Sequence, residues 1–448
     1  MKGRAVGTIS TQRTTWRGQA GRAVRSTGGS RRVTSSKTAA CGLALALGSS
    51  ALSLGLGVSG AAAAATAPGV TAKTITVGSI SDISSPIAGL FEGAKVGTEA
   101  YFAYINSKGG VNGRKLILNG MDSAFSSGTV ASEAASIAKN DFAIVGGFSL
   151  LDGAEKSAID AAKLPEVTQV LSPTLYKDPN LYSAIPLVTA GEATGPFKWL
   201  KSKYPQDVTH IGLIGSNSAA TAITAEHTFR KLTYSLGYKW LYSRDANYFE
   251  TTFLPDMIKM KNAGVKMVFE PTQQGAYIST MAQEIKQEGL NALLVSGSNA
   301  YEENFNPGSA GNGTLVTQVT ALYEGQDAKV VPAVATFDKW SKKVDPQTEL
   351  DLYTLYGWIN AQLFVQALKG AGANPTRASL DAQLDKITSF NASGLISPQD
   401  PAQKIPGQCW LVAQYDNGTW HRISPDPKSG FVCNPKGFYP SSYKGISR

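Results

Sequence analysis

Short apolar segments recur along the chain, and segments with helical spacing separate them. They are rich in Val, Ile and Leu, and their apolar residues do not alternate with polar ones, which favours parallel strands covered on both faces. The first group is ITVGSIS (75–81), KLILNG (115–120), FAIVGGFS (142–149) and PEVTQVLS (165–172). The second group is THIGLIGS (209–216), YKWLYSRDA (238–246), VKMVFEPT (265–272) and NALLVSGS (291–298).

The intervening segments predict amphipathic helices. Val130, Ala134 and Ile137 fall on one helical face, and Tyr277 begins a four-residue apolar repeat that ends before Gly289. Strands that alternate with helices form βαβ units, which build a doubly wound sheet. Because TAGEATG (189–195) separates the two groups, the pattern predicts two α/β lobes, each with a parallel sheet.

The stretch FAYINSKGGVNGRKLIL (102–118) shows how one unit passes into the next. We expect a helix to end at Lys108, with Gly109 as its left-handed cap. A turn at Gly113 then leads directly into the next strand. The stretch is therefore a structural connector.

The basic excess of the chain is confined to its start. Nine of the 42 Lys and Arg residues precede residue 41, and the first acidic residue is Asp82. The rest of the chain holds 33 basic and 33 acidic residues, so nothing predicts a basic patch or a nucleic-acid partner.

The basic start is followed by the apolar run CGLALALGSSALSLGLGVSG and by AAAAATA. This order is typical of a secretory signal, so we expect residues 1–65 to be removed on export. The alternative is a membrane anchor, but Gly and Ser interrupt the run and no charged stop-transfer segment follows. The expected location is therefore the extracellular or periplasmic face of the cell membrane.

Two cysteines remain without the leader, Cys409 and Cys433. An even count in an exported chain predicts a disulfide, and two separate buried thiols are the alternative. The three histidines, His210, His227 and His421, are not at metal-ligand spacing, so we expect neither a metal nor a cofactor.

Enzyme signatures such as GxSxG, GxxxxGK[ST] and HExxH are absent from the sequence, so we expect a protein that is not an enzyme. Ligands of open α/β sheets lie beyond the carboxyl ends of the strands. Hydroxyl, amide and helix N-terminal N–H groups at these ends suit a small polar solute, although each such residue is also an ordinary helix cap. The candidate ligand-binding residues are Ser85, Phe148, Ser149, Leu150, Ser172, Thr174, Ser216, Asn217, Ala219, Gln273, Gln274 and Tyr277.

Several of these segments together resemble a known family. They are SDISSPIAGL, INSKGGVNGRKLIL with the following Asp122, IVGGFS, LPEVTQVLSPT and the late helix YTLYGWINAQLFVQALKGAG. In this order the chain resembles the substrate-binding proteins of branched-chain amino-acid and amide ABC transporters, which have the type I periplasmic-binding-protein fold.

The resemblance implies two lobes joined by three chain crossings that close over a solute. Lobe 1 would hold residues 73–188 and 331–395, and lobe 2 would hold 189–330 and 396–448. The partner would be an ABC transporter permease, and the protein would act as a monomer.

By the same resemblance, Ser149 and the Ser172–Thr174 turn would hold the carboxylate of the solute. Ser216, Asn217 and Ala219 would form the turn of the second lobe that faces it.

Tyr277 falls near the position where amino-acid-binding members place a Glu that pairs with the solute ammonium. Glu270 or Asp152 could replace that Glu, although each also suits a capping or solvated acid. Gln273, Gln274 and Tyr277 would suit an amide, a urea-like group or an aromatic acid, so the solute class stays open between these and an amino acid.

Two other functions fit the same fold. A sensor module would report occupancy to a membrane receptor instead of a permease. A secreted hydrolase would need a nucleophile and a base that converge in the cleft, and the sequence offers no such pair.

Overall fold

The computed structural model describes residues 67–85, 89, 91–176, 178–186, 191–216, 220–247, 250–271, 273–434 and 437–440, with backbone alone for 216 and 220–225. The predicted leader, Asn217 and Ala219 lie outside these residues.

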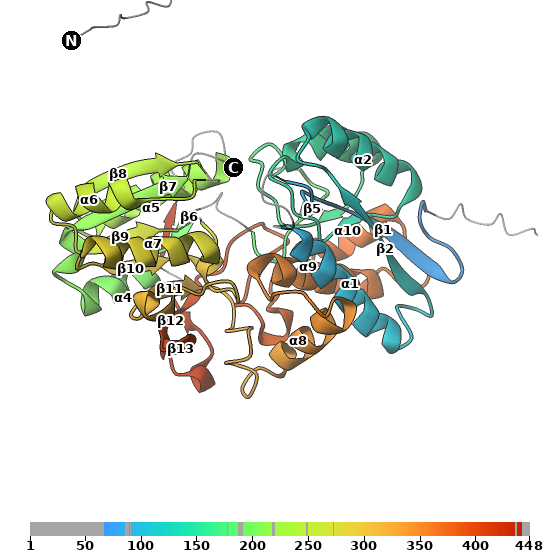
Figure 1. Ribbon diagram of the computed structural model, residues 1–448. Helices are drawn as coiled ribbons and strands as arrows, with labels where there is room; N and C mark the ends of the chain where they lie inside the picture. The colour runs from blue at the N-terminus through green and yellow to red at the C-terminus, as the bar shows by residue number, and fades with distance from the viewer. Residues whose placement is uncertain are drawn as a thin grey trace, which may run out of the picture. The chain divides into compact units, whose positions relative to one another are not determined.

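The first sheet has five parallel strands in the order β2-β1-β3-β4-β5 (Figure 1). The strands are β1 (Thr74–Ser81), β2 (Lys115–Asp122), β3 (Ile144–Val145), β4 (Glu166–Val167) and β5 (Leu181–Tyr182).

Helices cover both faces of the first sheet. One face buries Val77, Val145 and Val167 under α1 and α9, and the other buries Ile80 and Ile144 under α2 and α3. The helices are α1 (Glu92–Ser107), α2 (Ser127–Asn140), α3 (Lys156–Ala162), α8 (Pro332–Val344), α9 (Leu352–Gly370) and α10 (Arg377–Leu384).

Glycines let α9 approach α1 at backbone distance. A Cβ on Gly97 would lie 1.9 Å from the carbonyl oxygen of Thr354, and a Cβ on Gly357 would lie 2.0 Å from that of Ala94. A side chain at either position would push the helices apart, so this contact holds a segment from after residue 350 against the first sheet.

Arg377 ties α10 to the same part of the molecule. Its guanidinium donates to the carbonyl oxygens of Ala138, Asp141, Phe142 and Ala162, at 2.7 to 3.2 Å. These carbonyls lie at and beyond the C-terminal ends of α2 and α3. The last carbonyl groups of a helix have no N–H partner within the helix, and Arg377 supplies the donors that they lack.

The second sheet repeats the topology of the first. Its strands β8-β7-β9-β10-β11 are parallel, and β12 and β13 extend it in antiparallel pairing. The strands are β7 (Ile211–Ser216), β8 (Trp240–Ala246), β9 (Met267–Glu270), β10 (Leu293–Ser296), β11 (Leu315–Gln318), β12 (Cys409–Asp416) and β13 (Thr419–Ser424).

Helices cover the second sheet on both faces as well. Met260 and Met281 pack on the face that carries Val268, whereas Phe197 and Phe229 pack on the opposite face. The helices are α4 (Gly195–Lys203), α5 (Ala220–Ser235), α6 (Leu254–Asn262) and α7 (Gly275–Glu288).

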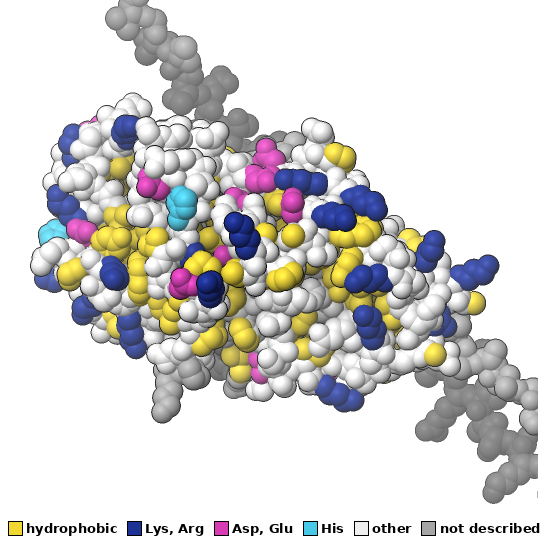
Figure 2. Space-filling model, turned by 90° about the horizontal axis from the view of Figure 1, so that it is seen from below, with side chains coloured by type: hydrophobic (Ala, Val, Ile, Leu, Met, Phe, Trp, Pro, Cys, Tyr) yellow, Lys and Arg dark blue, Asp and Glu magenta, His cyan; other side chains and the backbone are white. Residues whose placement is uncertain are grey.

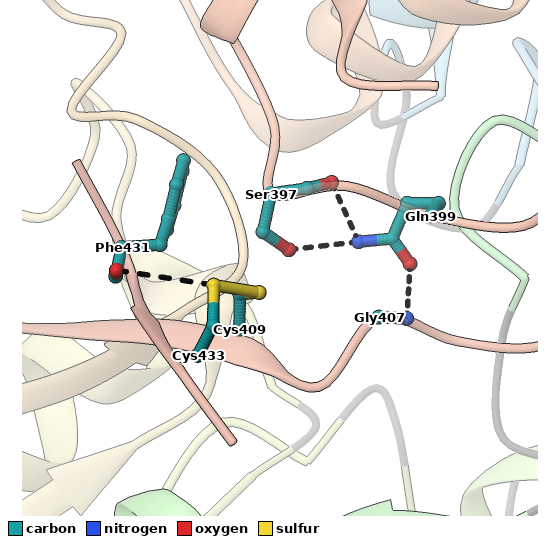
Figure 3. Close-up of a disulfide and its surroundings, with 6 residues drawn as sticks. All are labelled: Ser397, Gln399, Gly407, Cys409, Phe431 and Cys433. Carbon is teal, nitrogen blue, oxygen red and sulfur yellow. Dashed lines mark hydrogen bonds between the residues drawn. A yellow bond between two sulfur atoms is a disulfide. The ribbon is translucent and has the colours of Figure 1, made fainter. Parts of the chain in front are cut away.

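The predicted disulfide is confirmed. Cys409 and Cys433 are bonded and lie opposite each other where β14 (Val432–Cys433) pairs with β12 (Figure 3). Beside them, Gln399 closes the loop before β12, because its amide donates to Ser397 and its carbonyl oxygen accepts from the N–H of Gly407. The chain then returns to pair β15 (Phe438–Pro440) with β6 (Gly191–Ala193).

Each of the eight predicted segments contains a strand, but several of these strands are shorter than predicted. β3 and β4 contain two residues each, and β5 and β11 were not predicted at all. The prediction of full burial is wrong for β2 and β8, because both are edge strands and leave Ile117 and Leu241 exposed. The connector is close to the prediction: α1 ends at Ser107, one residue before the expected Lys108, and Gly109 and Gly113 have positive φ.

Charge is dispersed on the face shown in Figure 2, where Lys and Arg side chains are interspersed with hydrophobic and acidic ones. Across the residues that the structure describes, no helix combines the length and apolarity that a bilayer span requires.

Candidate functional site

The two sheets have the same strand order, which defines two switch points. In each sheet the first strand lies between the second and the third, so neighbouring connections leave in opposite directions at β1/β3 and at β7/β9. Ligands of such sheets bind beyond the carboxyl ends of the strands at these points. Asp82 and Phe148 follow β1 and β3, and Glu270 ends β9.

Asp82 links three segments at the first switch point. It is fully buried, and its carboxylate accepts hydrogen bonds from the Ser149 hydroxyl at 2.8 Å, the Leu150 N–H at 2.7 Å and the Ser123 hydroxyl. The Ser149 oxygen in turn accepts from the N–H of Leu151 at 3.0 Å. The Ser149 hydroxyl, which the sequence assigned to a solute carboxylate, is therefore engaged by a carboxylate of the chain.

Asp152 accepts backbone donors in the same way, in the segment after β4. It is also buried, and its Oδ2 accepts from the N–H groups of Leu171 and Ser172, at 2.6 and 3.0 Å. Its Oδ1 has no hydrogen-bond partner among the described residues. Burial raises the pKa of Asp152 to about 6, although these N–H groups lower it and the Asp82 charge adds to the rise.

Two further carboxyl groups lie behind Asp152. Glu155 and Glu166 are buried, and each has an oxygen without a partner among the described residues. Burial and mutual repulsion raise the pKa of Glu155, and burial raises that of Glu166 to about 8. No group of three or more side chains within the described residues is arranged to hold a metal ion.

Ser172 and Thr174 form a hydroxyl pair. Their oxygens lie 2.8 Å apart, with Ser172 half-buried and Thr174 exposed. One hydroxyl donates to the other, so the accepting hydroxyl keeps its own proton for another partner. Gly153 lets the turn come close, since a Cβ there would lie 2.7 Å from the Ser172 oxygen.

Phe148 belongs to an aromatic cluster that the sequence did not reveal. Its ring centroid lies 4.9 Å from that of Phe91, 4.7 Å from that of Tyr353 and 6.0 Å from that of Tyr356. The Tyr353 hydroxyl accepts a hydrogen bond from the Gln274 amide at 3.2 Å. Tyr353 therefore contacts two predicted site residues, Phe148 after β3 and Gln274 after β9.

The second switch point is also closed by carboxylates. Glu270 is fully buried and accepts the N–H of Gln273 at 2.7 Å, and the buried Glu302 accepts the N–H of Gly275. Both donors lie at the N-terminus of α7, where N–H groups lack intrahelical acceptors. The side chain of Gln273 is buried, and its Oε1 has no partner among the described residues.

The remaining predicted residues are placed as follows. Ser85 is half-buried in the bend after β1, and Leu150 is half-buried and packs against the large hydrophobic core. Tyr277 is half-buried in the first turn of α7, and burial raises the pKa of its hydroxyl. Ser216 ends β7, and Asn217 and Ala219 fall outside the described residues.

Sequence reasoning missed Asp82, Glu302 and Tyr353 at this site. An acidic residue directly after a buried strand was a usable signal for Asp82, because such a carboxylate needs several donors. Glu302 and Tyr353 had no comparable signal, since their partners lie 27 and 79 residues away.

The sequence profile described as periplasmic binding protein matches residues 74–419. A curated relative, the Leu/Ile/Val-binding protein homolog 2 of Brucella abortus (strain 2308), is 26% identical over 329 residues, which are 71% of this chain and 84% of the relative.

Two solved structures share the fold. One is a fatty acid ABC transporter substrate-binding protein from Thermomonospora curvata, with a TM-score of 0.65, 17% identity and coverage of 85% of this chain and 95% of that one. The other is an ABC transporter solute-binding protein from R. palustris in complex with 4-hydroxybenzoate, with a TM-score of 0.66, 18% identity and coverage of 81% and 98%.

Proposed function

Because the chain belongs to the periplasmic binding protein family, we propose that it is an exported, non-enzymatic solute-binding protein that delivers a small polar organic molecule to an ABC importer. The observation that carries this proposal is the pair of sheets with equal strand order, whose switch points carry polar and aromatic side chains.

The solute is held between two lobes that close by hinge motion. Lobe 1 comprises residues 73–188 and 331–395, and lobe 2 comprises 189–330 and 396–448. The packing of α9 on α1 supports the return of the chain to lobe 1, and the pairing of β12 with β11 supports its second return to lobe 2.

The contacts to the solute come from the carboxyl ends of both sheets. The Ser172–Thr174 hydroxyl pair offers a donor, and Phe148 offers an aromatic surface. Gln273, Gln274 and Tyr277 face the solute from the second lobe. The solute is an amino acid, an amide, a urea-like molecule or an aromatic acid. The name of the curated relative, for Leu, Ile and Val, supports an amino acid, and the solved structure with 4-hydroxybenzoate supports an aromatic acid, whereas the amide and urea-like classes rest on Gln273, Gln274 and Tyr277.

The protein works outside the cytoplasm and meets its partner at the membrane. Residues 1–65 direct export and are then removed. The solute-loaded form docks as a monomer on an ABC transporter permease, because closure brings both lobes into the relation that the permease recognises.

A thermal-shift screen tests this function. The chain from residue 67 onward is heated with L-leucine, L-phenylalanine, acetamide, urea and 4-hydroxybenzoate in turn. A solute at 100 times its dissociation constant adds about 2.7 kcal/mol to the free energy of unfolding, which raises the melting temperature by a measurable amount. A melting temperature that no small organic solute raises at millimolar concentration contradicts the proposal.

A further inference from the structure

Five backbone donors at the carboxyl ends of the two sheets, all among the residues that the structure describes, already donate to carboxylates of the chain. At the first sheet the N–H groups of Leu150, Leu171 and Ser172 donate to Asp82 and Asp152. At the second sheet the N–H groups of Gln273 and Gly275 donate to Glu270 and Glu302. These are the positions at which N–H groups of α/β sheets ordinarily hold the anionic group of a ligand.

We propose that Asp82, Asp152, Glu270 and Glu302 are specificity-determining residues that exclude an anionic group from this site, so that the solute presents neutral or cationic polar groups to it. This inference rests on the proposed function and narrows its solute class. Amides, urea-like molecules and amines fit, whereas a free carboxylate does not.

Charge supports the exclusion at the first sheet. A carboxylate placed beside Asp82 and Asp152 would meet two buried acidic side chains. The ammonium of Lys404 donates to the carbonyl oxygen of Asp178, and that of Lys156 bonds to the carboxylates of Asp160 and Asp178. Like charges in a desolvated site repel strongly, so an anion gains little here.

The free groups also favour a neutral or cationic solute. The Oε1 of Gln273 and the Oδ1 of Asp152 are buried acceptors without partners among the described residues. Both call for a donor, which an amide N–H or an ammonium supplies and a carboxylate lacks. The Ser172–Thr174 pair can face either a carbonyl oxygen or an N–H group.

Matched acids and amides test the selectivity. We would measure dissociation constants for 4-hydroxybenzoate against 4-hydroxybenzamide, butyrate against butyramide, and L-leucine against L-leucinamide. The amide should bind about tenfold or more tightly than the acid in any pair that binds. Asp82→Asn and Glu270→Gln should each bring the two constants closer, while Asp160→Asn, at an exposed carboxylate on α3, should leave their ratio unchanged.

Amide hydrogen exchange of the solute-free protein tests the same inference without any solute. The N–H groups of Leu150, Leu171 and Ser172 should exchange slowly, and Asp152→Ala, which removes the acceptor, should speed exchange at Leu171 and Ser172 by about tenfold or more. Fast exchange in the unsubstituted protein, or tighter binding of the acids than of their amides, would overturn the inference. A panel in which nothing binds would contradict the proposed function, and exchange would still decide whether these donors are occupied.

Discussion

Replacing Ser149 by Ala should destabilise the fold, although the sequence suggests a residue that serves only the solute. The side chain is 2% exposed, donates to the Asp82 carboxylate and accepts the N–H of Leu151. Its loss removes a bond to a charged group and leaves the partly buried N–H of Leu151 without its acceptor. We expect the free energy of unfolding to fall by about 2 to 4 kcal/mol.

Ser172→Ala is the matched comparison. This side chain is half-buried and, among the residues that the structure describes, bonds only to the Thr174 hydroxyl, so we expect a loss below about 1 kcal/mol. The assay is urea denaturation followed by tryptophan fluorescence, with Ser132→Ala as an exposed helical control. A loss for Ser149→Ala no larger than for Ser172→Ala would refute the assignment of the Ser149 hydroxyl to Asp82.

Three further changes test the stability of the fold. Burial raises the pKa of Glu166 to about 8, so the folded protein holds the proton of this group more tightly than the unfolded chain does. Its contribution to the free energy of unfolding is therefore fully present below the ordinary pKa of Glu and is lost as the pH rises toward 8. Glu166→Gln should therefore remove on the order of 3 kcal/mol of the fall in stability between about pH 5 and 8, and an unchanged profile in denaturation curves would contradict this. Arg377→Ala should lower the free energy of unfolding by about 3 to 5 kcal/mol because it frees four carbonyl oxygens, with Arg377→Lys in between; a loss below about 1 kcal/mol would refute that role. Replacing Cys409 and Cys433 together by Ala should cost about 3 kcal/mol, and both cysteines should escape alkylation unless first reduced, so labelling without reduction would disprove the bond.

The fold could be predicted from the sequence wherever a segment was long enough to show its period. β1, β7 and β9 were found because their apolar residues do not alternate with polar ones, and α7 because its apolar face repeats every four residues. β5 has two residues and β11 has four, which is too few to distinguish a strand from a loop. Edge position is also invisible in one sequence, so β2 and β8 were expected to be fully covered.

The candidate site was predictable only as a set of strand ends. Turn chemistry placed Ser149 and Ser172 after their strands, but it could not show that Asp82 and Asp152 already hold the neighbouring donors. The bonds to Asp82 come from residues 41 to 68 positions away, and the one between Gln274 and Tyr353 spans 79. Such contacts depend on how the sheets and helices pack, which local pattern does not encode.

The most direct test of the proposed function is calorimetric titration of the chain with the best solute from the thermal-shift screen, followed by mass spectrometry of the recovered solute. We expect one solute bound per chain, heat that returns to baseline after each injection, and a solute recovered chemically unchanged. Sustained heat from turnover, or a solute recovered in altered form, would contradict a protein that captures and delivers its solute.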